Sequence, residues 1–173
     1  MARNVQKRTS SIRTQLMAIT GLAIAVTAVA FSVVSYYLER QALLAGIDEK
    51  LVTAALLARQ VPAPGYFDRI EGPESVSREE YLDIVRRNNR LCRKLDLQYL
   101  WSCMVMDGKI AFTTATSPGK DASAMDHASF LDVHRDPQAF DTVFSTMQPD
   151  FSSFRNEWGH GRMVLLPFRD NRG

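Results

Sequence analysis

The stretch LQYLWSCMVMDGKIAFTT, residues 97–114, decides the fold of the second half of the chain. It holds two runs rich in aromatic and branched residues, separated by the dipeptide Asp107-Gly108. Asp-Gly between two such runs is the strongest short-range signal for a β-hairpin, because both residues tolerate the positive φ angles of a tight turn. We therefore predict antiparallel strands at Leu97–Met106 and Lys109–Thr114.

The segment before this hairpin has the start signal of a helix. Ser77-Arg-Glu-Glu80 is a capping box, in which the Ser hydroxyl and the Glu carboxylate each accept a hydrogen bond from a free backbone N–H. One apolar face then recurs at helical spacing and comprises Tyr81, Ile84, Val85, Leu91, Cys92 and Leu95. This pattern predicts an amphipathic helix between Ser77 and Leu95.

The segment after the hairpin is irregular from Ala115 to His134. Asp136-Pro137 then predicts the start of a short helix. Its apolar face comprises Phe140, Val143, Phe144 and Met147. Two more strands are predicted at Phe151–Arg155 and Arg162–Phe168. Residues 61–173 are therefore predicted to form an α+β domain, with an antiparallel sheet and flanking helices.

The N-terminal residues form a different kind of segment. Residues 16–38, LMAITGLAIAVTAVAFSVVSYYL, are a run of 23 without a charge, and 18 of them are apolar. An apolar helix of about 20 residues spans a bilayer, and Tyr36 and Tyr37 stand where an aromatic belt belongs. We predict a transmembrane helix in contact with the lipid bilayer. A cleaved signal peptide, suggested by Ala28-Val29-Ala30, is the alternative.

Charge gives this helix a direction. Residues 1–15 carry four basic residues and no acid, whereas all 19 acids lie at or after Glu39. The positive-inside rule then places the basic tail in the cytoplasm and everything from Glu39 onward outside. The formal charge of +2 therefore reflects a membrane flank and gives no support to nucleic-acid binding.

Helical spacing continues past the membrane, over residues 39–60. The apolar stripe comprises Leu44, Ile47, Leu51, Ala54 or Ala55, and Ala58, and Pro62 ends it. Such a stripe either faces the core of the domain or pairs with the same helix of a second subunit. Both can be true along different turns.

Sequence motifs for catalysis are missing. The chain contains no G-x-S-x-G elbow, H-E-x-x-H, C-x-x-C or phosphate-binding loop, so no catalytic residue, cofactor or metal is predicted. Asp126-His127 and Asp132-x-His134-x-Asp136 could be drawn as a metal cluster, but a polar loop explains them more simply. Strand alternation points Cys103 away from Cys92, which argues against a disulfide.

Aromatic and cationic residues form the candidate binding set. Tyr99 and Trp101 share one strand face, and Arg155, Trp158 and Arg162 flank the second hairpin. Rings bury an apolar body and Arg holds a carboxylate through two hydrogen bonds, which suits a small organic acid or amino acid. The alternative is that the aromatic residues are simple core and the arginines extend into solvent.

A basic N-terminus, one membrane helix, a long helix and a small α/β domain together resemble the sensory part of bacterial transmembrane receptors. The domain is similar to the Cache type, an extracytoplasmic relative of the PAS fold. The residues that carry the likeness are Tyr81-Leu82, YLWSCMVMDGKIAFT (Tyr99–Thr113), Asn156-Glu-Trp-Gly159 and the strand ending VLLPFRDNRG.

This resemblance implies a non-enzymatic, ligand-sensing input region in the bacterial inner membrane, with its sensory domain in the periplasm. It also implies a histidine kinase or diguanylate cyclase output and a homodimer formed through the long helix. A signal-anchored periplasmic enzyme and a structural or assembly protein are the alternative classes.

The resemblance further implies the strand order 2-1-5-4-3, with a fifth strand between the first and the fourth. Because the chain ends in turn residues at Asp170–Gly173, we expect the domain to be cut before that strand. The inner edges of Leu97–Met106 and Arg162–Phe168 are then expected to lack partners, which predicts marginal stability.

Overall fold

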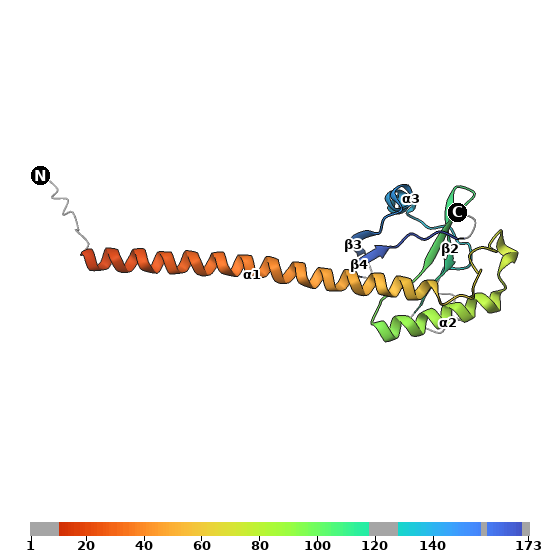
Figure 1. The fold of residues 1–173 in the computed structure, drawn as a ribbon, viewed down its shortest axis with the longest axis horizontal. Helices are drawn as coiled ribbons and strands as arrows, with labels where there is room; N and C mark the ends of the chain where they lie inside the picture. Colours follow the sequence, from red (N-terminus) through yellow and green to blue (C-terminus); the bar gives the residue numbers. More distant parts are fainter. Residues whose placement is uncertain (1–10, 118–127, 157–158, 171–173) are drawn as a thin grey trace, which may run out of the picture. The chain divides into compact units, whose positions relative to one another are not determined.

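The computed structural model describes residues 11–117, 128–156 and 159–170. Its elements are, in order, α1 (Ile12–Arg59), η1 (Pro73–Ser75), α2 (Arg78–Leu95), β1 (Ser102–Met106), β2 (Lys109–Thr114), η2 (Pro137–Phe140), α3 (Asp141–Thr146), β3 (Asp150–Asn156) and β4 (Gly159–Leu165). The predicted α+β class is confirmed, and Figure 1 shows α1 as one unbroken helix. The chain has two compact units, Met1–Gly46 and Ile47–Gly173, and the boundary between them falls inside α1.

The first unit contains the apolar part of α1. Its large apolar side chains are exposed, and α1 is long and apolar enough to cross a membrane, a criterion that a signal sequence also meets. Two hydroxyl groups in this stretch return hydrogen bonds to carbonyls one turn earlier: Thr27 to Ala23 and Ser32 to Ala28, each at 2.9 Å. These bonds give both hydroxyl groups a partner within the helix.

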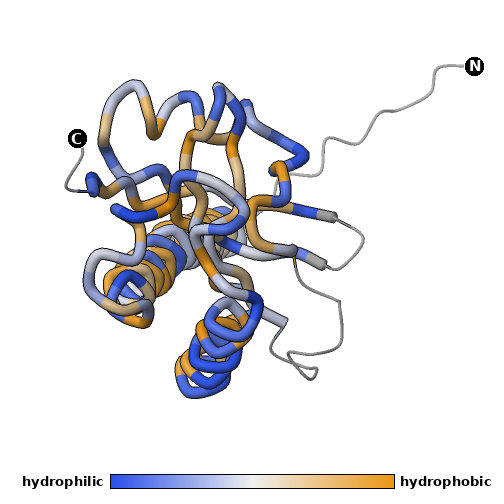
Figure 2. Tube along the Cα trace, turned by 90° about the vertical axis from the view of Figure 1, so that its right-hand side faces the viewer, coloured by the Kyte–Doolittle hydropathy of each residue, from blue (hydrophilic) through white to orange (hydrophobic). Residues whose placement is uncertain are grey.

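The amphipathic helix predicted from the capping box is α2. The Ser77 hydroxyl accepts a hydrogen bond from the Glu80 N–H, as predicted. The Glu80 carboxylate differs from the prediction, because it pairs with the Arg69 guanidinium and not with a backbone N–H. Figure 2 shows α2 as a mixture of hydrophilic and hydrophobic residues, in keeping with its single buried face.

The hairpin predicted at the Asp-Gly dipeptide forms between β1 and β2, in antiparallel register. Asp107 and Gly108 have φ angles of 50° and 71°, as a tight turn of this kind requires. The first strand begins at Ser102, five residues later than predicted. Residues 97–101 instead form an irregular segment along a cavity.

Two apolar clusters pack on the β1–β2 hairpin, one for each face. Met104 and Met106 pack on a cluster that contains the α2 residues Tyr81, Ile84 and Val85. Trp101 and Cys103 pack on a second cluster, formed by Ile110, Phe140, Val143 and Leu165. The predicted alternation is therefore confirmed, and Cys92 and Cys103 are both free thiols.

The second edge of β2 is bonded to a segment that the sequence analysis left irregular. Leu131 donates its N–H to the Phe112 carbonyl at 2.8 Å, and Phe112 donates to Asp132 at 2.9 Å. His134 donates to the Ile110 carbonyl at 2.8 Å. The buried Tyr66 hydroxyl donates a hydrogen bond to the backbone carbonyl of Thr113 in β2, with 2.7 Å between the two oxygens. The β1–β2 hairpin is thus fixed on both faces and one edge.

The strands β3 and β4 form a separate two-stranded antiparallel sheet, paired from Asp150↔Leu165 to Asn156↔Gly159. The strand β4 ends three residues earlier than predicted, before Pro167, whose missing N–H cannot extend a ladder. Within the described residues, β1 pairs only with β2 and β4 pairs only with β3. Both hairpins therefore keep an open edge there.

Candidate functional site

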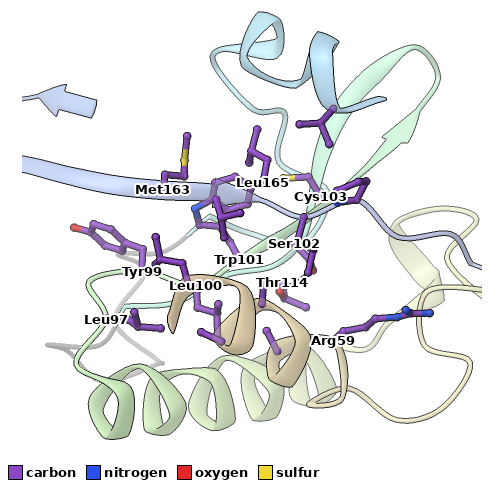
Figure 3. Close-up of a pocket in the computed structure, with 18 of the residues that line it drawn as sticks. Arg59, Leu97, Tyr99, Leu100, Trp101, Ser102, Cys103, Thr114, Met163 and Leu165 are labelled. Carbon is purple, nitrogen blue, oxygen red and sulfur yellow. Dashed lines mark hydrogen bonds between the residues drawn. The ribbon is translucent and has the colours of Figure 1, made fainter. Parts of the chain in front are cut away.

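A cavity of about 850 Å³ lies in the unit Ile47–Gly173. Its walls come from the last turns of α1, the segment before β1, η2 with α3, and β4 with the residues that follow it. Figure 3 shows Trp101 between the β4 side and the α1 side, with Tyr99 and Arg59 toward opposite ends of the group. The cavity is large enough for a small organic molecule.

Small side chains on α1 make room for this cavity. Ala54 is 1% exposed, and Ala55 and Ala58 line the cavity as well. These residues belong to the stripe predicted over residues 39–60, so that stripe faces the core in this part. Other apolar side chains of α1 remain exposed, among them Leu56 and Leu57.

Aromatic rings gather at one end of the cavity. The Trp101 ring centroid lies 5.8 Å from that of Phe140 and 6.0 Å from that of Phe112. The His134 ring lies among all three of these side chains. Val143 and Leu165 add apolar surface to the same lining. Such a wall suits the flat or apolar body of a ligand.

The guanidinium of Arg162 lines the cavity from β4 and has a partner on α1. Its Nε donates to Asp48 Oδ1 at 2.5 Å and one terminal nitrogen donates to Oδ2 at 2.7 Å. Both side chains are 23% exposed. This two-bond pairing lowers the pKa of Asp48 and raises the pKa of Arg162.

The sequence-predicted binding residues separate into three groups. Tyr99, Trp101 and Arg162 line the cavity, although the Arg162 guanidinium is engaged by Asp48. Arg155 is exposed on β3 and is not part of the lining. Trp158 lies outside the described residues.

The candidate binding set omitted several charged or imidazole side chains of the lining, namely Lys50, Arg59, Asp96, His134 and Asp136. Arg59 lies over the Phe168 ring, 5.0 Å from its centroid, and donates to the Arg169 carbonyl at 3.5 Å. The basic residue at the end of a helical pattern was the available signal for Arg59, but it is equally typical of a helix C-terminus. His134 stood out in the sequence only as part of the Asp132-x-His134-x-Asp136 pattern, which a polar loop explained more simply.

The candidate metal ligands and the two cysteine thiols give no support to metal or thiol chemistry in the part of the chain that the structure describes. No group of three His, Cys, Asp or Glu residues there could hold a metal ion, and Asp126-His127 lies outside that part. Burial raises the pKa of the Cys92 thiol to about 11 and that of Cys103 to about 12. Both thiols are therefore protonated and weakly nucleophilic at neutral pH.

Comparison of the chain with protein-family models, with curated proteins and with solved structures finds no match in any of the three.

Proposed function

We propose that this chain is the membrane-anchored, extracytoplasmic ligand-sensing input region of a bacterial signal-transduction receptor. In this proposal it has the Cache type of PAS-like domain, belongs most specifically to a sensor histidine kinase, and binds a small organic ligand without catalysing a reaction. The apolar part of α1 anchors it in the inner membrane, the sensory domain is periplasmic, and two copies associate through α1.

The observation that carries the proposal is that α1 contains both the candidate membrane span and part of the cavity wall. One continuous helix, Ile12–Arg59, contains both the apolar stretch and the turns that line the cavity. A ligand that fits one arrangement of these turns better than another shifts the population between the two arrangements. Because no Pro interrupts the helix, such a change has a covalent path toward the membrane.

The association of two copies is supported by exposed apolar residues on the same helix. Leu43 and Leu57 are 69% and 41% exposed, whereas Ala54 between them is buried. A helix with one face in the core and apolar residues elsewhere has surface available for a second helix.

The test uses the full chain in lipid nanodiscs and its intrinsic tryptophan fluorescence. The chain has two Trp residues, Trp101 and Trp158, and both belong to the predicted binding set, so both are kept. Titration with a panel of amino acids and small carboxylates should give a saturable fluorescence change and a higher melting temperature for at least one compound. A flat response to the whole panel contradicts ligand sensing and favours a structural role.

A matched pair of variants in η2 assigns the binding to the cavity. Ala139→Leu enlarges a side chain that lines the cavity. Gln138→Leu introduces the same side chain at the neighbouring exposed residue, which does not line the cavity. The first variant should weaken binding at least tenfold and the second should leave it unchanged. Equal effects in the two variants place the binding elsewhere.

A further inference from the structure

His134 occupies a position that the fold fixes through its backbone. Its N–H donates to the Ile110 carbonyl at 2.8 Å, and the preceding residue forms a bridge with Ala111. Its Cα is therefore held as if it belonged to a third strand beside β2. The side chain is half-buried and belongs to the cavity lining.

Three aromatic rings surround the imidazole. Its centroid lies 4.8 Å from that of Phe140, 5.1 Å from that of Phe112 and 5.7 Å from that of Trp101. The imidazole therefore packs against aromatic rings from β2, η2 and the segment before β1.

The hydrogen bonds of Nδ1 determine whether Nε2 of the imidazole is a donor or an acceptor. Nδ1 lies 3.1 Å from both the backbone nitrogen and the carbonyl oxygen of Asp136. In the neutral tautomer in which Nδ1 accepts from the Asp136 N–H, Nε2 carries the hydrogen, whereas in the other neutral tautomer Nδ1–H donates to the Asp136 carbonyl and Nε2 is an acceptor. The tautomer that accepts from the Asp136 N–H therefore presents an Nε2–H donor.

This donor has no partner among the described residues, and Nε2 is not one of the buried polar atoms closed off from solvent there. The other obvious donor at this wall, the Arg162 guanidinium, is engaged by Asp48. The imidazole thus supplies a free N–H beside the aromatic end of the cavity.

We infer that His134 is a ligand-binding residue, whose Nε2–H donates to a carboxylate or carbonyl oxygen of a molecule with a flat or apolar body. The body lies against Trp101 and Phe140, and the acceptor oxygen meets the imidazole. This inference rests on the proposed function, since it names the polar contact of the same cavity. It selects against ligands whose polar group is only a donor.

The experiment compares two probes of one shape and opposite hydrogen-bonding character. Benzoate offers acceptor oxygens, whereas benzamidine is a cation that offers only donors. The full chain in nanodiscs is titrated with each probe, and its tryptophan fluorescence reports binding. We expect benzoate to bind more tightly than benzamidine.

Two variants then test the imidazole itself. His134→Phe keeps an aromatic ring and removes the donor, so it should weaken benzoate about tenfold, the loss of one hydrogen bond to a charged group, and leave benzamidine unchanged. His134→Gln restores an N–H donor and should recover part of the benzoate affinity. Melting temperatures of both variants check that the domain stays folded.

The outcomes separate the two proposals. If both probes bind and the ratio of their affinities is the same with and without His134, the inference about His134 is wrong and the ligand-sensing proposal stands. If neither probe binds the parent chain at millimolar concentration while a compound of the panel does, the inference about His134 is wrong and the ligand-sensing proposal stands. If the panel gives a flat response as well, both are wrong.

Discussion

The two β-hairpins of the unit Ile47–Gly173 have the same connectivity but are held in different ways. The hairpin β1–β2 has an apolar cluster on each face, and β2 is bonded along its second edge to residues 131–134. The hairpin β3–β4 has one buried residue among its described positions, Leu165, and a charged pair that joins Arg162 to Asp48.

This difference indicates where the domain can move. Opening β1–β2 exposes apolar surface and breaks ladder hydrogen bonds, so it requires nearly global unfolding. Opening β3–β4 away from α1 breaks the Asp48–Arg162 pair and the contacts of Leu165 and Met163 with one apolar cluster, so it exposes less apolar surface. The second hairpin is therefore expected to open more readily than the first.

The largest effect is expected from removing support beneath β1–β2. Tyr66 is 1% exposed and donates its hydroxyl to the Thr113 carbonyl, so Tyr66→Ala leaves a cavity and an unpaired carbonyl. We expect a loss of about 3–5 kcal/mol in the free energy of unfolding, measured by urea denaturation of the full chain in detergent. Tyr99→Ala, at a residue 49% exposed, is the matched control and should stay within about 0.5 kcal/mol. Similar losses in both variants contradict the comparison.

A smaller and local effect is expected from breaking the Asp48–Arg162 pair. Asp48→Asn should increase amide hydrogen exchange in β3 and β4 severalfold and leave exchange in β1 and β2 unchanged. The double variant Asp48→Arg with Arg162→Asp keeps the attraction with reversed charges and should restore part of the protection. Uniform acceleration across both hairpins shows that the second hairpin has no independent opening.

The same pair predicts a pH dependence confined to one hairpin. The folded state lowers the pKa of Asp48 below its ordinary value of 3.8, so the pair contributes stability above that pH. This contribution is lost as the pH falls through the lowered value. Exchange in β3–β4, measured relative to β1–β2 in the same sample, should therefore increase below about pH 4. Asp48→Asn should not show this change, and a parallel change in that variant assigns it to another carboxyl.

The smallest effect is a difference in the labelling rates of the two thiols. Cys103 is half-buried in the cavity lining, whereas Cys92 is completely buried. Opening of β3–β4 should expose Cys103, so Asp48→Asn should speed its reaction with N-ethylmaleimide and leave Cys92 unchanged. Cys92→Ser and Cys103→Ser report each thiol alone. Faster labelling of Cys92 in the Asp48→Asn variant means that the helix side has opened instead.

Local signals in the sequence were sufficient for most of the secondary structure. The Ser77 cap and the apolar periodicity gave α2, and Asp107-Gly108 gave the first hairpin, because helix caps and tight turns depend on a few adjacent residues. Strand ends were less accurate. Residues 97–101 have strand-like composition, but their aromatic side chains pack in the cavity wall and the ladder begins only at Ser102.

The candidate site depended on contacts that no local pattern encodes. Arg162 and Asp48 are 114 positions apart, so the pairing of a predicted ligand-binding arginine with α1 was not visible in the sequence. His134 stands in a polar stretch that looked like a loop. Its role becomes apparent only when the edge of β2 brings it among Trp101, Phe112 and Phe140.

The open edges of β1 and β4 have a consequence for crowding on a membrane surface. Within the described residues each edge carries backbone N–H and C=O groups that no neighbouring strand uses. An extended segment of another chain gains hydrogen bonds at such an edge without breaking any. Under the proposed anchoring, copies are confined to two dimensions and their local concentration is raised. Edge-to-edge pairing then competes with the proposed association through α1, and it sets an upper limit on the density at which separate copies persist.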